Sequence, residues 1–134
     1  MNFSQKFLLY FMTLSAFVSI DLLLVFVFSR RLYRINLGGL LRAKLNIIPA
    51  VIFYIMFTLG LLTFVIVPAF NSDSLRQAIG MGALFGLFAY GTYSLINRAM
   101  IRNWTRIIML TDIFRGVIVS GAACAIAFYI SRGF

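Results

Sequence analysis

The sequence predicts an all-α membrane protein, and three observations lead to this fold class. Of the 134 residues, 63% are hydrophobic and 11% are charged, whereas soluble domains usually carry about 25% charged residues. The mean hydropathy is +1.02. The chain also contains four apolar stretches, each close to the roughly 20 residues that a helix needs to cross a bilayer. Because little sequence lies between them, any functional site must be built from the helices and their short connections.

Four transmembrane helices are expected, over residues 7–28, 47–69, 78–97 and 107–130. An up-down bundle with short loops is the simplest architecture for four such helices, and the whole chain then forms a single domain. A cleavable signal peptide is the alternative for the first stretch. It is disfavoured because the apolar part exceeds the usual length of about 7 to 15 residues and contains Asp21. The N-terminal helix is therefore expected to be retained.

The distribution of cations predicts the orientation of the helices. Five cations lie in the first connection and three in the third: Arg30, Arg31, Arg34, Arg42 and Lys44, then Arg98, Arg102 and Arg106. Only Lys6, Arg76 and Arg132 lie in the tails and the second connection. The positive-inside rule then places the first and third connections in the cytoplasm and both termini on the non-cytoplasmic side. Within the second connection, Ser72 or Asp73 is expected to cap the third helix.

The net charge of +9 is explained by these connections, which would also attract anionic lipid headgroups. A nucleic-acid partner is not expected, because the chain has no soluble surface with interleaved aromatic residues that could read bases. Cys124 is the only cysteine, and histidine is absent. An intramolecular disulfide, a cysteine metal cluster, histidine-ligated haem and histidine-rich di-iron sites are thereby excluded. We expect no cofactor and no metal site.

Small residues at four-residue spacing mark two helices. The third helix has Ala78, Gly82 and Gly86, and the fourth has Gly116, Ser120 and Cys124. Helices pack closely in lipid where small residues let their backbones approach. Contact between the third and fourth helices within one monomer is therefore expected, and homodimerisation through the same face is the alternative.

Three ionisable residues lie inside the apolar stretches. Asp21 belongs to the first helix, and Asp112 and Arg115 belong to the fourth. With the predicted orientation and a rise of about 1.5 Å per residue, all three lie in the cytoplasmic half of the membrane, roughly 8 to 12 Å inside. Ionisable groups at this depth are costly, so each is a candidate functional residue. Asp112 and Arg115 could instead simply pair with each other, whereas Asp21 has no local partner.

Polar residues of the third helix lie at the same depth. Tyr90, Tyr93, Ser94 and Asn97 fall at i, i+3, i+4 and i+7, so they share one helix face. Together with Asp21, Asp112 and Arg115 they are expected to form one polar cluster that opens towards the cytoplasm. The alternatives are that the tyrosines are interfacial aromatics and that Asn97 marks a helix end.

Several short motifs along almost the whole chain carry a family resemblance. They are Asp21-Leu22, Tyr33 before Leu37-Gly38, Phe53-Tyr54, Val67-Pro68-Ala69, residues 82–87, residues 89–93, Asn97, Trp104, Asp112 and Gly116. In this order they resemble a family of small bacterial inner-membrane proteins, domain-of-unknown-function family 2177. The family has no established reaction. Its association with genes for lipid-modifying enzymes implies a role near membrane lipids.

The chain departs from the family pattern at three positions. Ser94 stands where the family usually has Asp, Arg115 where it usually has Trp, and Leu24 where a tryptophan is expected. A lost carboxylate and a gained cation change the charge of the predicted cluster. Two functions follow as hypotheses. The first is a non-enzymatic protein that binds a lipid-like or small polar ligand, or that serves as an accessory subunit for a membrane protein partner. The second is a membrane-embedded lipid-modifying enzyme or proton-coupled transporter that uses Asp21 and Asp112.

Overall fold

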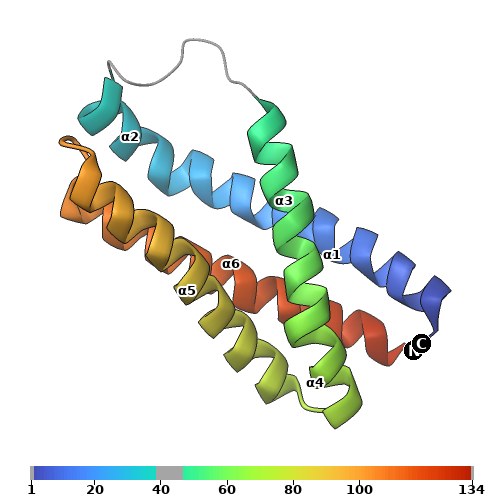
Figure 1. Cartoon of the computed structure of the whole chain (residues 1–134). Coiled ribbons are helices and arrows are strands. Elements are labelled where there is room, and N and C mark those ends of the chain that lie inside the picture. Colours follow the sequence, from blue (N-terminus) through green and yellow to red (C-terminus); the bar gives the residue numbers. More distant parts are fainter. Residues whose placement is uncertain (1, 39–46, 134) are drawn as a thin grey trace.

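The computed structural model describes residues 2–38 and 47–133, and the secondary structure of these residues is entirely helical (Figure 1). The chain begins with α1 (Phe3–Leu24), the π-helical turn η1 (Val25–Ser29) and α2 (Arg30–Leu37). It continues with α3 (Ile47–Leu61), the π-helical turn η3 (Leu62–Ile66), α4 (Val67–Ser72), α5 (Leu75–Met100) and α6 (Arg106–Arg132). Arg42 and Lys44 of the predicted basic connection lie outside the described residues.

Four continuous helical segments are long and apolar enough to cross a membrane: Phe3–Val27, Ile47–Ser72, Leu75–Met100 and Arg106–Arg132. The all-helical class with four such helices is therefore confirmed. Large apolar side chains cover the outside of the molecule. Met56, Phe64 and Phe88, for example, are 67%, 66% and 63% exposed. Such a surface is unfavourable in water and suits a hydrocarbon surrounding.

Polar caps extend the helices beyond the apolar stretches. Asn2 and Gln5 form a reciprocal capping box at the start of α1, with hydrogen bonds of 2.9 and 3.1 Å. Ser74 caps α5 by accepting a hydrogen bond from the Gln77 amide. The expectation that Ser72 or Asp73 would cap this helix is wrong. Asp73 instead ends α4 in the left-handed conformation, with φ of 50°, which Asp tolerates better than most residues do.

Pro68 explains the wide turn of η3. A proline has no amide hydrogen, and its ring collides with the carbonyl of the residue four positions earlier, here Phe64 within η3. The helix therefore widens between residues 62 and 66 instead of breaking. The other π-helical turn, η1, follows Asp21 closely and joins α1 to α2. The continuous helix formed by α1, η1 and α2 thus carries both Asp21, in its membrane-spanning part, and the basic residues of α2.

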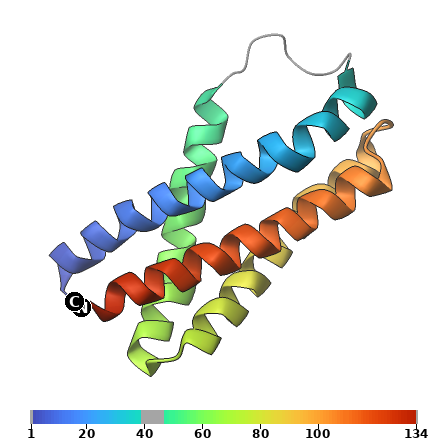
Figure 2. The same ribbon diagram turned by 180° about the vertical axis from the view of Figure 1, so that it is seen from behind.

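Helices α5 and α6 run side by side along their lengths in both views (Figures 1 and 2). Helix α1 packs on α6, and α3 packs on α1. The N-terminal part of α3 diverges from α5, whereas η3 and α4 contact it (Figure 1). The two termini lie together at one end of the molecule, and α2 and the connection between α5 and α6 lie at the other (Figure 2). Consequently α5 and α6 form the most extensive helix contact, and the N-terminal part of α3 stands away from α5.

Glycines make the contact between α5 and α6 possible. A Cβ atom at Gly86 would lie 2.3 Å from the Gly116 carbonyl oxygen, and one at Gly82 would lie 2.7 Å from Sγ of Cys124. A Cβ atom at Gly116 would lie 2.2 Å from the Tyr90 ring. Ser120 is fully buried in the same contact. The two stripes of small residues therefore face each other within one chain.

Candidate functional site

An ionic cluster centred on Arg115 connects α1 and α6. Nε of Arg115 lies 3.3 Å from Oδ1 of Asp21, and Nη1 lies 3.7 Å from Oδ1 of Asp112. The two aspartate side chains are buried, with exposed fractions of 4% for Asp21 and 0% for Asp112, and that of Arg115 is largely buried, at 12%. Because charges inside a membrane protein must be paired or reach water, one guanidinium between two carboxylates is a favourable arrangement. The structure thus brings together three residues that come from two helices far apart in sequence.

Two tyrosines complete the cluster. Tyr54 of α3 donates a hydrogen bond of 2.6 Å to Oδ2 of Asp21. Tyr33 of α2 donates to both oxygens of Asp112, at 2.5 and 2.6 Å. Burial and the adjacent Asp112 carboxylate raise the pKa of the Tyr33 hydroxyl, so that it keeps its proton and remains a donor. Each carboxylate therefore has one cationic and one hydroxyl partner, and the cluster joins α1, α2, α3 and α6.

Tyr90 of α5 forms the wall of the cluster. The Arg115 guanidinium carbon lies 5.6 Å from the centre of the Tyr90 ring, within the range of a cation–π contact. Tyr90 is only 4% exposed. Its hydroxyl has no hydrogen-bond partner among the described residues, and the same holds for Oδ1 of Asp21, whose approach to Arg115 is ionic. Two buried polar atoms at the same place are thus left without hydrogen bonds, which is unusual because such atoms are nearly always satisfied.

The remaining residues of the predicted polar face pack towards the C-terminal end of α5. Ser94 is fully buried, donates to the Met109 carbonyl at 3.2 Å and accepts from the Trp104 indole at 3.1 Å. Tyr93 is 48% exposed, and its ring contacts Trp104 at 5.7 Å between centroids. Asn97 is half-buried, and its carbonyl accepts the Ile101 amide beyond the end of α5. Ser94 and Asn97 support the turn between α5 and α6, and Tyr90 contacts Arg115.

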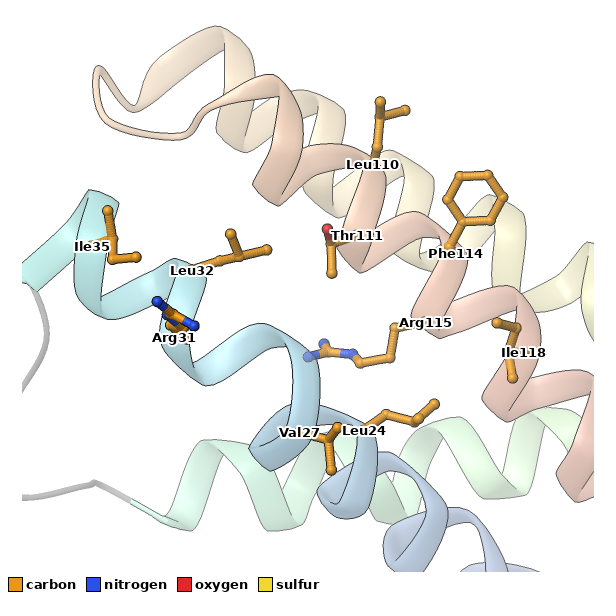
Figure 3. Close-up of a pocket in the computed structure, with 10 residues that line it drawn as sticks. All are labelled: Leu24, Val27, Arg31, Leu32, Ile35, Leu110, Thr111, Phe114, Arg115 and Ile118. Atoms are coloured by element: carbon orange, nitrogen blue, oxygen red, sulfur yellow. The ribbon is translucent and has the colours of Figure 1, made fainter.

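Two cavities adjoin Arg115, one on each side. The apolar groove lies between the rod of α1, η1 and α2 on one side and α6 on the other, with a volume of about 710 Å³. Its lining is Leu24, Val27, Arg31, Leu32, Ile35, Leu110, Thr111, Phe114, Arg115 and Ile118. Figure 3 shows Arg115 reaching from α6 towards the helix that carries Leu24 and Val27. Arg31 and Thr111 are the other polar residues of this groove.

The aromatic cavity lies between α1, α3 and α5, where α3 diverges, and has a volume of about 700 Å³. Its lining is Asp21, Val25, Tyr33, Pro49, Ala50, Phe53, Tyr54, Ala89, Tyr90, Tyr93 and Arg115. Both volumes fall within the range of roughly 300 to 1,000 Å³ typical of small-molecule sites. The predicted polar cluster is therefore flanked by space that a ligand can occupy.

Tyr33 and Tyr54 are the site residues that the sequence did not place in the cluster. Both lie outside the polar face of the third predicted helix, and Tyr33 follows the first membrane span. Their hydroxyls reach the carboxylates only because α3 packs on α1 and because η1 carries the chain on into α2. The signal available in the sequence was the presence of two buried acids that needed donors, with tyrosines at a similar depth on neighbouring helices.

The chemistry open to the cluster is limited by its pairing. Both carboxylates are engaged by Arg115 and by a tyrosine, so neither is placed as an unengaged general base. In the part of the chain that the structure describes, no group of three acidic, histidine or cysteine side chains could hold a metal ion. The arrangement is best suited to binding a ligand through charge, aromatic faces and hydrogen bonds.

Comparison with known families gives a match over most of the chain. The family described as Predicted membrane protein (DUF2177) matches residues 6–129, which confirms the resemblance drawn from the sequence motifs. No curated protein and no solved structure matches the chain.

Proposed function

The chain belongs to this family of predicted membrane proteins, and from that premise and the geometry around Arg115 we propose that it is a non-enzymatic ligand-binding protein. It binds a lipid-like or small polar ligand through the ionic cluster, alone or as an accessory subunit beside a membrane protein partner or a second copy. We place it in the bacterial inner membrane as a multi-pass protein. Membrane lipids are its expected partners.

The observation that carries this proposal is the position of the two cavities. Each exceeds what a single water molecule needs, each is lined mainly by apolar side chains, and each reaches the same buried guanidinium. A lipid-like molecule combines an apolar chain with a polar headgroup, and these cavities combine an apolar lining with a few polar groups. The pairing of both carboxylates supports binding over proton transfer.

The proposed orientation is an up-down bundle with both termini outside and the cluster in the cytoplasmic half of the bilayer. The support is the positive-inside rule, together with α2 and the α5–α6 connection lying at one end (Figure 1). In a Cys124→Ser background, a cysteine at exposed Asn71 should react with an impermeant maleimide added to intact cells. A cysteine at exposed Arg102 should react only after permeabilisation. The reverse pattern would invert the orientation.

The binding function is tested with the purified full-length protein and in cells. Native mass spectrometry of the protein extracted in a mild detergent should show a retained lipid, and deletion of the gene should change the cellular lipid profile. Asp21→Asn should lower lipid retention, whereas Asp73→Asn serves as the matched control, because Asp73 is exposed and ends α4. A protein that retains no lipid, with an unchanged lipid profile of the deletion strain, would leave the accessory-subunit role in place of ligand binding.

The alternative function is a lipid-modifying enzyme or proton-coupled transporter that uses Asp21 and Asp112. The observation in its favour is that Asp21 lines the aromatic cavity and that one of its oxygens accepts no hydrogen bond from any residue that the structure describes. Four helices are few for a transporter that acts alone, so a transporter would require oligomerisation. Turnover that is lost in Asp21→Asn while the protein still accumulates and still retains lipid would favour this alternative.

A further inference from the structure

The aromatic cavity has a charge preference that follows from the ionic cluster. Two carboxylates, those of Asp21 and Asp112, surround one guanidinium, that of Arg115. With all three side chains charged, the ionic cluster carries one negative charge in excess. An excess charge in a buried, membrane-level site is costly and is relieved by a counter-ion. An anionic group in this cavity would add to the excess, whereas a cationic group would neutralise it.

The walls of the cavity suit an organic cation. Phe53, Tyr54 and Tyr90 line it beside Asp21, and the rings of Phe53 and Tyr54 lie 5.4 Å apart, while those of Phe53 and Tyr90 lie 6.0 Å apart. Aromatic faces attract cations through the ring quadrupole, and recognition of ammonium groups by aromatic cages is a general use of this effect. A carboxylate at the edge of several rings therefore favours an ammonium group over a hydrated metal ion.

The two atoms without hydrogen bonds specify the kind of ammonium. Among the described residues, Oδ1 of Asp21 accepts no hydrogen bond and the hydroxyl of Tyr90 makes none, although both residues are at least nine-tenths buried and both line the cavity. A buried acceptor without a donor is destabilising, and an N–H group that reaches it removes that penalty. A primary ammonium has three N–H donors, whereas a quaternary ammonium has none.

We propose that the aromatic cavity binds the primary ammonium of an ethanolamine-type lipid headgroup, between the carboxylate of Asp21, the hydroxyl of Tyr90 and the ring of Phe53. This inference rests on the proposed lipid-binding function and names its ligand class. A lipid is favoured over a free amine as the source, because most of the cavity lining is apolar and belongs to membrane-spanning helices. The exposed cations Arg30, Arg31 and Arg34 on α2 follow directly after the span that carries Asp21.

The experiment uses the full-length chain, purified in detergent and stripped of lipid. Phosphatidylethanolamine, phosphatidylcholine and phosphatidylglycerol with identical acyl chains are added in turn, and binding is measured by native mass spectrometry and by the shift of the thermal midpoint. Phosphatidylethanolamine should bind about three- to tenfold more tightly than phosphatidylcholine, the gain expected from about one net hydrogen bond. Phosphatidylglycerol should bind most weakly. Free phosphoethanolamine, added in a further arm, should give a much smaller shift than the lipid.

Variants separate the headgroup contact from general lipid affinity. Asp21→Asn removes the excess negative charge and should abolish the preference for phosphatidylethanolamine. Phe53→Leu is a second variant that leaves the ionic cluster intact and removes one aromatic face, and it should weaken the preference for phosphatidylethanolamine over phosphatidylglycerol about two- to tenfold. Phe88→Leu is the matched control, because Phe88 lies on α5, is 63% exposed and does not line the cavity. Its lipid preference should equal that of the wild type.

The outcomes distinguish this inference from the function on which it rests. Equal binding of the three lipids, or a preference unaffected by both Asp21→Asn and Phe53→Leu, would overturn the assignment of the ammonium while lipid binding itself stands. Tighter binding of phosphatidylcholine would overturn the role of the N–H donors. If free phosphoethanolamine shifts the thermal midpoint as much as the lipid does, the ammonium group need not come from a lipid, and that part of the inference is overturned. Failure of all three lipids to bind would overturn the proposed function as well.

Discussion

The two sides of the molecule differ in how their helices meet. Helices α5 and α6 touch through glycine, with backbone so close that a Cβ at Gly86 would lie 2.3 Å from a carbonyl oxygen. On the other side, α1 and α3 meet through large side chains. Phe17 stacks on Phe57 at 4.9 Å, and Tyr54 reaches across to Asp21. Close packing fills the first contact, whereas the aromatic cavity lies beside the second and reaches Arg115.

The difference teaches which part of the molecule is scaffold and which part is available for binding. Small residues let helices associate in lipid, where no hydrophobic force draws them together. A contact of that kind has no room for a ligand. Where the helices are farther apart, polar side chains connect them. Here the ionic cluster links α1, α3 and α6 beside the cavities.

Arg115→Leu should have the largest effect. It leaves the carboxylates of Asp21 and Asp112 buried without their shared cation, and breaking a buried ion pair from one side typically costs about 3 to 5 kcal/mol. The free energy of unfolding, measured by steric trapping in bicelles, should fall by that amount. The triple variant Arg115→Leu with Asp21→Asn and Asp112→Asn should recover much of the loss, because no unpaired charge remains. A single variant as stable as the wild type would show that the cluster is not paired as described.

Gly86→Ala should have the next largest effect, this time in the scaffold. The added methyl group meets the Gly116 carbonyl and the Ser120 side chain, so α5 and α6 must separate. Overpacking of this kind usually costs about 1 to 3 kcal/mol, and it should lower the thermal midpoint in detergent. Gly80→Ala on the same helix is the matched control, because a Cβ there meets nothing within 4 Å. If both variants melt together, the contact is looser than its geometry indicates.

The scaffold was largely predictable from the sequence, and the open side was not. Hydropathy locates helices of membrane length because every backbone polar group in lipid must be satisfied within the segment. Four-residue spacing of small residues placed Gly82, Gly86 and Gly116 on the contact that forms. Helix ends were less predictable. Ser74 rather than Ser72 or Asp73 caps α5, because the left-handed Asp73 marks where α4 ends.

The ionic cluster shows why its full set of residues could not be predicted from the sequence. Helical periodicity identifies residues that share a face of one helix, so it grouped Tyr90, Tyr93, Ser94 and Asn97. The rotation of α5 against α6 decides which of these four side chains points towards Arg115. The close approach at Gly116 brings the Tyr90 ring to the Arg115 guanidinium. The partners Tyr33 and Tyr54 depend on helices that are distant in sequence. No spacing rule within a single helix connects them to the aspartates.

Removing a single tyrosine hydroxyl should have the smallest effect. Two tyrosine hydrogen bonds between α1 and α3 allow a charged acceptor to be compared with a neutral one. Tyr54 of α3 donates to the Asp21 carboxylate at 2.6 Å, and Tyr10 of α1 donates to the Ile55 carbonyl at 2.9 Å. Tyr54→Phe should cost about 1 to 2 kcal/mol and Tyr10→Phe about 0.5 kcal/mol, because hydrogen bonds inside membrane proteins average about 0.6 kcal/mol and those to charged groups are stronger.

The two variants separate the cluster from ordinary packing between α1 and α3. Both replace tyrosine by a residue of nearly the same shape, so ring packing is kept and only the hydroxyl is lost. Steric trapping of each variant, alone and combined with Asp21→Asn, gives the coupling energy. Tyr54→Phe should lose most of its effect in the Asp21→Asn background, whereas Tyr10→Phe should keep its own, because Tyr10 has no contact with the carboxylate. Equal losses in both backgrounds would mean that Tyr54 stabilises the helix pair independently of Asp21, and the ionic cluster would then end at Arg115.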